Sequence, residues 1–134
     1  MMEETGSKKK VLVVDDEPGI RSTLRKSLTK EYLVLEASNG EVAIDMARQE
    51  KPDIILMDIM MPKVDGYTAC YSIKEDPTTK AIPVVMLTAL GFELNKKLGQ
   101  QMGVDGYITK PFDYHSLLDT IKHFLRDRAS SEAD

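Results

Sequence analysis

The sequence predicts an α/β fold in which helices cover both faces of a parallel sheet. Short apolar runs alternate five times with longer stretches whose apolar residues recur at helical spacing. The apolar runs are continuous, as in VLVV, IILM and PVVML. The strands of a half-exposed antiparallel sheet would instead alternate apolar and polar residues, so these runs favour strands that are buried on both sides.

The expected elements follow one another along the whole chain. Strands are expected at 11–14, 33–37, 54–57, 83–87 and 106–109. Helices are expected around the apolar positions of 20–28, 42–47, 67–73, 94–102 and 117–125. This order of elements predicts one continuous sheet and a single domain.

Helix start and stop signals agree with this division. Pro18 suits the first turn of a helix, with Asp16 or Glu17 in position to cap it. Asp113 is placed to cap the last helix, and Gly103 lies where a helix ends in a left-handed residue. The boundaries therefore come from residue chemistry as well as from periodicity.

Length and composition limit the classes of protein to consider. The 134 residues suit one domain, expected at 9–126, between a flexible tail at 1–8 and a polar tail at 127–134. A net charge of −4 argues against direct binding of nucleic acid. No apolar run is long enough for a membrane span or a signal peptide, and Cys70 is the only cysteine. We therefore expect a cytoplasmic protein that does not insert into membranes.

Polar side chains follow four of the five expected strands. Asp15 and Asp16 follow the first strand, Asp58 the third, Thr88 ends the fourth, and Lys110 follows the fifth. In a parallel sheet the carboxyl ends of all strands meet at one edge, where ligands of such folds bind. The sequence therefore predicts that these side chains gather there.

Three carboxylates in one partly buried site repel one another and need positive charge nearby. Lys110 supplies one charge, and a divalent cation would supply two more. Oxygen ligands suit Mg²⁺, whereas zinc prefers histidine and cysteine. The two histidines, His115 and His123, make no zinc motif, so the expected cofactor is Mg²⁺.

Four segments together resemble one known family. They are VLVVDDEP, PDIILMDIMMPKVDG, PVVMLTA and GYITKPF. In this order and spacing, over 9–126, they are similar to the receiver domain of two-component response regulators. The resemblance implies a flavodoxin-like, doubly wound five-stranded parallel sheet of order 2-1-3-4-5 with five helices.

The resemblance also implies roles for the acidic residues. Asp58 matches the residue that accepts the phosphoryl group. Asp15 and Asp16 match the acidic pair that holds Mg²⁺, Asp16 directly and Asp15 largely through water, while Met60 would offer its backbone carbonyl to the metal.

Other positions match the parts that bind the phosphoryl group and transmit its arrival. Thr88 matches a switch hydroxyl, Lys110 a phosphoryl-binding lysine and Tyr107 an aromatic residue that changes rotamer. The Lys110–Pro111 peptide bond matches one that is cis in the family.

Two apolar residues occupy the positions that tune hydrolysis of the phosphoryl group in the family. They are Met60, two residues after Asp58, and Leu90, two residues after Thr88. Apolar side chains at both positions predict poor access of the attacking water and a long-lived phosphorylated state.

The resemblance implies a signalling switch of a two-component system, and not an enzyme for an external substrate. The phosphoryl donor would be a histidine kinase, and a downstream protein would bind the face formed by the fourth helix, fifth strand and fifth helix. No effector module follows Arg128, so we expect a stand-alone response regulator of the chemotaxis or motility type. A phosphorelay intermediate and a receiver fragment of a larger regulator are the alternatives.

Taken alone, each residue also has an ordinary structural interpretation. Asp15 and Asp16 could cap a helix, Thr88 could end a strand, and Lys110 could be a surface lysine. Asp58 is the hardest to explain in this way, because no helix begins immediately after its strand. The joint occurrence of these residues at one sheet edge favours the functional interpretation.

Two further classes share the expected fold. A magnesium-dependent phosphatase of the haloacid dehalogenase class would need a second acid two residues after its nucleophile, where this chain has Met60. A receiver-like protein that is never phosphorylated would have no need of Asp58, Thr88 and Lys110 together. The sequence therefore disfavours both.

Overall fold

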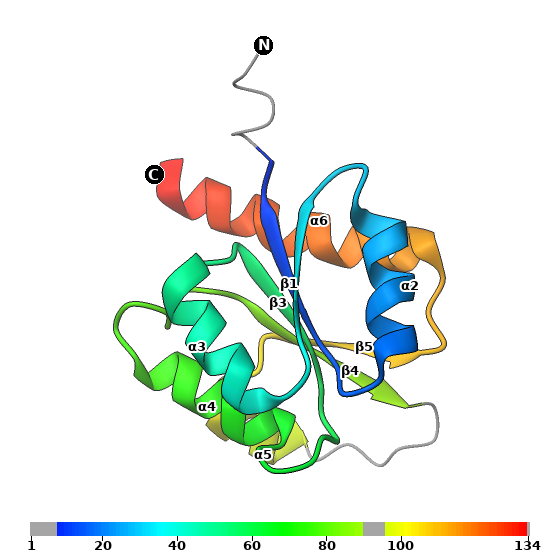
Figure 1. Cartoon of the computed structure of the whole chain (residues 1–134). Helices are drawn as coiled ribbons and strands as arrows, with labels where there is room; N and C mark the ends of the chain where they lie inside the picture. The colour runs from blue at the N-terminus through cyan, green and yellow to red at the C-terminus, as the bar shows by residue number, and fades with distance from the viewer. Residues whose placement is uncertain (1–7, 90–95, 134) are drawn as a thin grey trace.

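A computed structural model describes residues 8–89 and 96–133 of the chain and contains one five-stranded parallel sheet (Figure 1). Its order is β2-β1-β3-β4-β5, as the sequence predicts. The strands are β1 (Lys10–Val14), β2 (Leu33–Ala37), β3 (Ile54–Asp58), β4 (Val84–Ala89) and β5 (Gly106–Lys110). The five helices of the described residues are α2 (Pro18–Leu28), α3 (Gly40–Glu50), α4 (Gly66–Glu75), α5 (Lys96–Met102) and α6 (Tyr114–Ala133).

The helices cover both faces of the sheet, and each face has its own hydrophobic cluster (Figure 1). Alternate residues of a strand point to opposite faces. In β1, for example, Leu12 belongs to the cluster under α3, α4 and α5, whereas Val13 belongs to the cluster under α2 and α6. Both residues are fully buried, which explains why the apolar runs of the sequence are continuous.

Three helices begin with an acidic or amide side chain that accepts a backbone hydrogen bond. Asn39 Oδ1 accepts from Val42 N at 2.9 Å, Asp65 Oδ1 from Thr68 N at 2.8 Å and Asp113 Oδ1 from Ser116 N at 2.8 Å. These bonds satisfy amides that would otherwise lack a partner at the start of a helix. The predicted cap by Asp113 is confirmed.

The predicted cap of α2 by Asp16 or Glu17 is wrong. Glu17 occupies the cap position, but no side chain caps this helix, which begins with Pro18. The Glu17 amide instead donates to Asp15 Oδ1 at 2.9 Å. The loop after β1 therefore folds around the carboxylate of Asp15.

Two backbone features expected from the sequence are present. Gly103 has a φ of 90°, the left-handed conformation that ends α5, and the Lys110–Pro111 peptide bond is cis.

The last helix, α6, continues to Ala133, through most of the segment in which we expected a polar tail from 127. Its sequence DRASSEA contains neither glycine nor proline, so nothing in it breaks the helix. No helix among the described residues has the length and apolarity needed to cross a membrane.

Candidate functional site

The three carboxylates predicted to meet at the sheet edge do meet there. Asp15 directly follows β1 and Asp58 ends β3, and the pairing of Val14 with Met57 sets these two neighbouring strand ends side by side. One carboxylate oxygen each from Asp15, Asp16 and Asp58 lies within 4.8 Å of the others. The loop after β1 and the end of β3 thus form one acidic cluster.

Asp15 is the most firmly held of the three. Its side chain is fully buried, with Oδ2 3.0 Å from Lys110 Nζ and Oδ1 accepting from the Glu17 amide. Its backbone carbonyl accepts from Arg21 Nη1 at 2.6 Å, and Arg21 Nε lies 3.2 Å from Glu36 Oε1. Arg21 thus ties the acidic loop to α2 and β2, a positioning role that we did not predict from the sequence.

Asp58 is enclosed but still open to a ligand. Its side chain is 13% exposed, and Oδ1 lies 3.6 Å from Lys110 Nζ. Burial and the neighbouring Asp15 carboxylate raise the pKa of Asp58 from 3.8 to about 6, Lys110 offsets part of this rise, and Asp16 adds to it. The carboxyl group of Asp58 is therefore ionised at neutral pH, but its charged form is energetically unfavourable. A bound cation, or a reaction that removes the charge, would relieve this cost.

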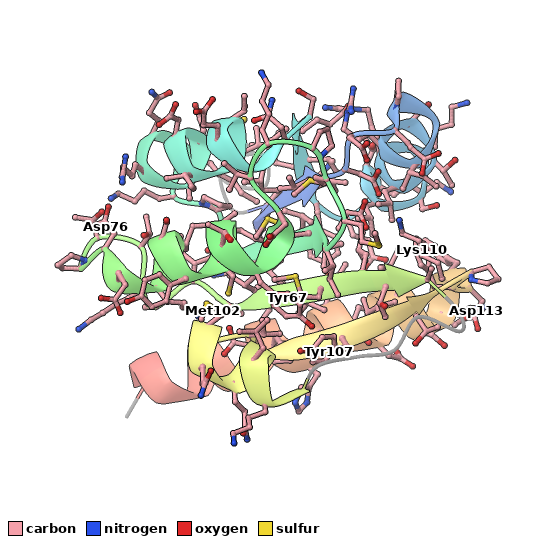
Figure 2. All side chains as sticks on the ribbon, turned by 90° about the horizontal axis from the view of Figure 1, so that it is seen from below. Tyr67, Asp76, Met102, Tyr107, Lys110 and Asp113 are labelled. Carbon is pink, nitrogen blue, oxygen red and sulfur yellow. The ribbon has the colours of Figure 1, made fainter. Side chains whose placement is uncertain are left out.

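Lys110 reaches into the cluster from the end of β5 (Figure 2). Burial by itself lowers the pKa of Lys110, but its hydrogen bond to Asp15 and the charges of Asp58 and Asp15 together raise it above the ordinary value. The ammonium group is thus a fixed positive charge between two carboxylates. In the chain, Lys110 is followed directly by its cis peptide bond to Pro111.

Thr88 contributes a hydroxyl group without a partner. Its side chain is buried near the end of β4. Among the described residues, no hydrogen-bond partner is found for its Oγ1 atom. A buried hydroxyl without a partner costs about 1–3 kcal/mol, so such a group marks a place where a ligand can bind. Because β4 pairs with β3 through Leu87 and Asp58, this hydroxyl lies at the same sheet edge as the carboxylate.

Except for the fully buried Asp15, these groups line one cavity of about 290 Å³. Its walls include Asp16, Asp58, Met60, Thr88 and Lys110. The donor atoms are carboxylate oxygens, a hydroxyl and an ammonium group, a set that suits a hard divalent cation and a small oxyanion together. The predicted hydrolysis-tuning residue Met60 is 66% exposed at this cavity, whereas Leu90 lies outside the described residues.

Tyr107 lies on the face of the sheet covered by α3, α4 and α5. It pairs with Met86 of β4, and Met86 comes two residues before Thr88. The side chains of Tyr107 and Thr88 are therefore both on this face. The hydroxyl oxygen of Tyr107 lies 3.4 Å from that of Tyr67 on α4, and Figure 2 shows the two tyrosines between α4 and β5. Burial raises the pKa of Tyr107 above its ordinary value, and the hydrogen bond and electrostatic interaction with Tyr67 raise it further. In the sequence, Tyr67 is only one of the apolar positions of the third expected helix, and nothing local marks it as a partner of Tyr107.

Comparison with protein families matches residues 11–122 to the response regulator receiver domain. A probable transcriptional regulator ycf27 of Guillardia theta is 44% identical over 121 residues, which cover 90% of this chain and 46% of that protein. Protein PilH of Pseudomonas aeruginosa is 42% identical over 117 residues, which cover 87% of this chain and 97% of that protein. This chain thus spans about half the length of several relatives that it matches and nearly all of another.

Solved structures show the same fold. A putative response regulator from Chloroflexus aurantiacus superposes with a TM-score of 0.84 at 33% identity, over 90% of this chain and 99% of that one. The receiver domain of the sensor histidine kinase PA1611 from Pseudomonas aeruginosa superposes with a TM-score of 0.81 at 27% identity, over 89% of this chain and 98% of that one. The PA1611 structure has a magnesium ion coordinated in its active-site cleft.

Proposed function

Because this chain belongs to the family of response regulator receiver domains, we propose that it is a phosphorylation-activated switch whose Asp58 accepts a phosphoryl group from a histidine kinase. One observation carries the proposal. The Asp58 carboxylate lies in a cavity that also contains the Lys110 ammonium group and the Thr88 hydroxyl, which has no partner among the described residues. These are the groups that a new phosphate on Asp58 would need around it.

The chemistry follows from the positions of these groups. A carboxylate oxygen of Asp58 attacks the phosphorus of the kinase phosphohistidine, so an O–P bond forms and the P–N bond breaks, and the imidazole nitrogen takes a proton. Above its pKa of about 6, Asp58 needs no base to remove a proton. Lys110 would neutralise charge on one phosphoryl oxygen, and Thr88 would donate its hydroxyl proton to another.

The same cavity suits Mg²⁺. The carboxylates of Asp15, Asp16 and Asp58, with the backbone carbonyl of Met60, would hold it, and their close approach is consistent with a divalent cation. When bound, Mg²⁺ supplies positive charge that neutralises the transferring phosphoryl group. Support comes from the hard oxygen donors of this chain and from the magnesium in the cleft of the PA1611 receiver domain.

The signal would pass from Thr88 to Tyr107. A phosphate on Asp58 draws the Thr88 hydroxyl toward it, because this hydroxyl has no competing partner among the described residues. Tyr107, on the same face of the sheet, responds by changing its rotamer. The surface that changes is formed by α5, β5 and α6, and a downstream protein binds there.

In this proposal the chain catalyses only its own phosphorylation and dephosphorylation. It acts in the cytoplasm and contacts neither nucleic acid nor a membrane.

The exposed Met60 supports slow loss of the phosphoryl group. It lines the cavity, and its thioether can neither donate a proton to an attacking water molecule nor accept one from it. The same property disfavours the phosphatase alternative, which needs an acid at this position. A phosphorylated form that decays within seconds would contradict the slow loss.

The relatives favour two settings for this switch. PilH, which this chain matches over 97% of its length, supports a stand-alone response regulator, which we expect to be of the motility or chemotaxis type. The transcriptional regulator ycf27, about twice as long as its matched part, supports a receiver that is part of a larger regulator. A phosphorelay intermediate, which passes the phosphoryl group onward, is a third setting with the same site chemistry.

Intact-mass spectrometry tests the proposal. The protein is incubated with acetyl phosphate and Mg²⁺, beside Asp58→Asn and a sample with excess chelator. We expect one phosphoryl adduct on the wild type, none on Asp58→Asn and little without metal. Absence of an adduct with acetyl phosphate and with a phosphorylated histidine kinase would overturn the proposal. Steady release of phosphate from other esters would instead favour the phosphatase.

A further inference from the structure

We propose that Gly99 and Tyr67 together form a seat that holds the Tyr107 ring inward, against α4 and α5, and so set how readily the switch operates. This inference rests on the proposed function for the meaning of the switch. The geometry of the seat stands independently of phosphorylation. It joins α4 to α5 and β5, two elements that come later in the chain and pack near α4 (Figure 1).

Gly99 provides the space for the Tyr107 hydroxyl. A Cβ atom added at Gly99 would lie 2.0 Å from the Tyr107 hydroxyl oxygen and 3.3 Å from its ring carbon Cζ. No real side chain tolerates such a contact, so any residue larger than glycine at 99 would displace the Tyr107 ring. Gly99 has no positive φ, and a close approach of the tyrosine therefore explains this glycine better than backbone conformation does.

Tyr67 closes the other side of the seat. Its side chain is 9% exposed within the hydrophobic cluster against which Tyr107 packs. The two hydroxyl oxygens are 3.4 Å apart, within reach of a long hydrogen bond in which either group can donate. The same hypothetical Cβ at Gly99 lies 3.5 Å from Tyr67 Cε1, so Tyr67 also borders the space next to Gly99. Figure 2 shows Tyr67 and Tyr107 near each other, Tyr67 on α4 and Tyr107 on β5.

The seat acts on the switch through the balance between two positions of Tyr107. In this seat the Tyr107 ring is partly buried. The seat therefore favours this inward position of the ring over a solvent-exposed one. Removing the space at Gly99 should move the ring outward, and removing the Tyr67 hydroxyl should weaken its hold by less, since the packing of the Tyr67 ring remains.

The test is ¹⁹F NMR of protein labelled with 3-fluorotyrosine, with the Tyr107 resonance assigned by Tyr107→Phe. Solvent exposure of that resonance is measured from its shift between H₂O and D₂O. We expect a small solvent shift in the wild type, a large one in Gly99→Ala and an intermediate one in Tyr67→Phe. Acetyl phosphate with Mg²⁺ should still give the phosphoryl adduct in both variants, because neither residue lines the cavity around Asp58.

Two matched controls separate the seat from general effects of substitution. Gly19→Ala is also a helical glycine, but its added Cβ meets no atom within 4 Å. Tyr71→Phe removes a hydroxyl from the same helix as Tyr67, at a side chain that is 45% exposed. Both controls should leave the Tyr107 resonance unchanged. A buried Tyr107 resonance in folded Gly99→Ala, or an exposed one in the wild type, would overturn the inference. Loss of the adduct in the wild type would overturn the proposed function and leave this reading of the seat intact.

Discussion

Asp58 shows at the level of one residue how the site stores an unfavourable charge. Its carboxylate is largely enclosed, next to the buried Asp15, and Lys110 offsets only part of the repulsion. Because one ammonium group faces two of the three carboxylates, the cluster has more negative than positive charge. Such an arrangement costs stability, and it favours ligands and reactions that remove the excess.

Asp58→Asn should therefore stabilise the metal-free protein at pH 7.5. The pKa of Asp58 is 3.8 when unperturbed and about 6 in the folded protein, so ionisation destabilises the fold fully above pH 6 and not at all below about pH 4. The full shift corresponds to about 3 kcal/mol, and residual hydration of the group reduces the expected gain to about 1 kcal/mol.

Urea unfolding at several pH values, with a chelator present, measures this gain. The difference between Asp58→Asn and the wild type should shrink as the pH falls from 7.5 to 4. Asp45→Asn, at an exposed side chain of α3, is the matched control and should change little. An equal gain at pH 4 and pH 7.5 would show that the destabilisation does not come from the Asp58 charge.

Thr88 gives a second prediction at this scale. Thr88→Val replaces the unpartnered hydroxyl with a methyl group of similar size, so the metal-free protein should become more stable by up to about 1 kcal/mol. The phosphoryl adduct should still form, but partner binding should no longer depend on it. Thermal unfolding and binding assays measure the two effects, and a loss of 1 kcal/mol or more would show that the hydroxyl has a stabilising partner.

Most residues of the site could be predicted from the sequence because each ends a strand. Asp15, Asp58, Thr88 and Lys110 follow apolar runs, and a parallel sheet brings such ends together. The contacts of Arg21, Tyr67 and Gly99 could not be predicted in this way, because they depend on how helices pack against the sheet. The cap of α2 was mispredicted for a related reason, since the Asp15 carboxylate takes the Glu17 amide.

At the scale of elements, the connection from β3 to α4 fixes the position of Asp58. The chain leaves β3 at Asp58, turns through Met60 and Met61, and returns so closely that the Gly66 amide donates to the Ile59 carbonyl at 2.8 Å. A Cβ atom at Gly66 would lie 2.4 Å from the backbone oxygen of Asp58. Because that atom is backbone, it cannot move aside cheaply, and α4 begins where no larger residue fits.

Gly66→Ala should consequently destabilise the protein by about 2 kcal/mol, the range typical of overpacking. It should also slow formation of the phosphoryl adduct, since the strain falls on the backbone of Asp58. Chemical denaturation and the rate of the mass increase measure the two effects. Gly19→Ala, which meets open space, serves as control and should show neither. Wild-type stability in Gly66→Ala would contradict the close approach of the two segments.

At the scale of the whole molecule, the buried sheet separates two hydrophobic clusters and carries the site at one edge. Cys70 lies within the cluster under α3, α4 and α5, with no exposed surface. Burial raises the pKa of its thiol to about 12, well above the ordinary range. The thiol is therefore both inaccessible and protonated in the folded protein.

Cys70 should react with a thiol reagent only when the core opens. The labelling rate in native buffer should be at least about a hundredfold below that of the urea-unfolded chain, since several kcal/mol separate the two states. Absorbance change with an aromatic disulfide reagent measures both rates. Comparable rates would mean that the cluster around α4 opens without unfolding of the domain.

Backbone amide NMR shows whether a phosphoryl group on Asp58 changes the face formed by α5, β5 and α6. Spectra of the wild type and Thr88→Ala are recorded with Mg²⁺, before and after addition of acetyl phosphate. In the wild type we expect shifts around Asp58 and also at Gly99, Tyr107 and neighbouring residues of that face. In Thr88→Ala the shifts should stay near Asp58. Shifts confined to the cavity in the wild type would contradict the proposed switch.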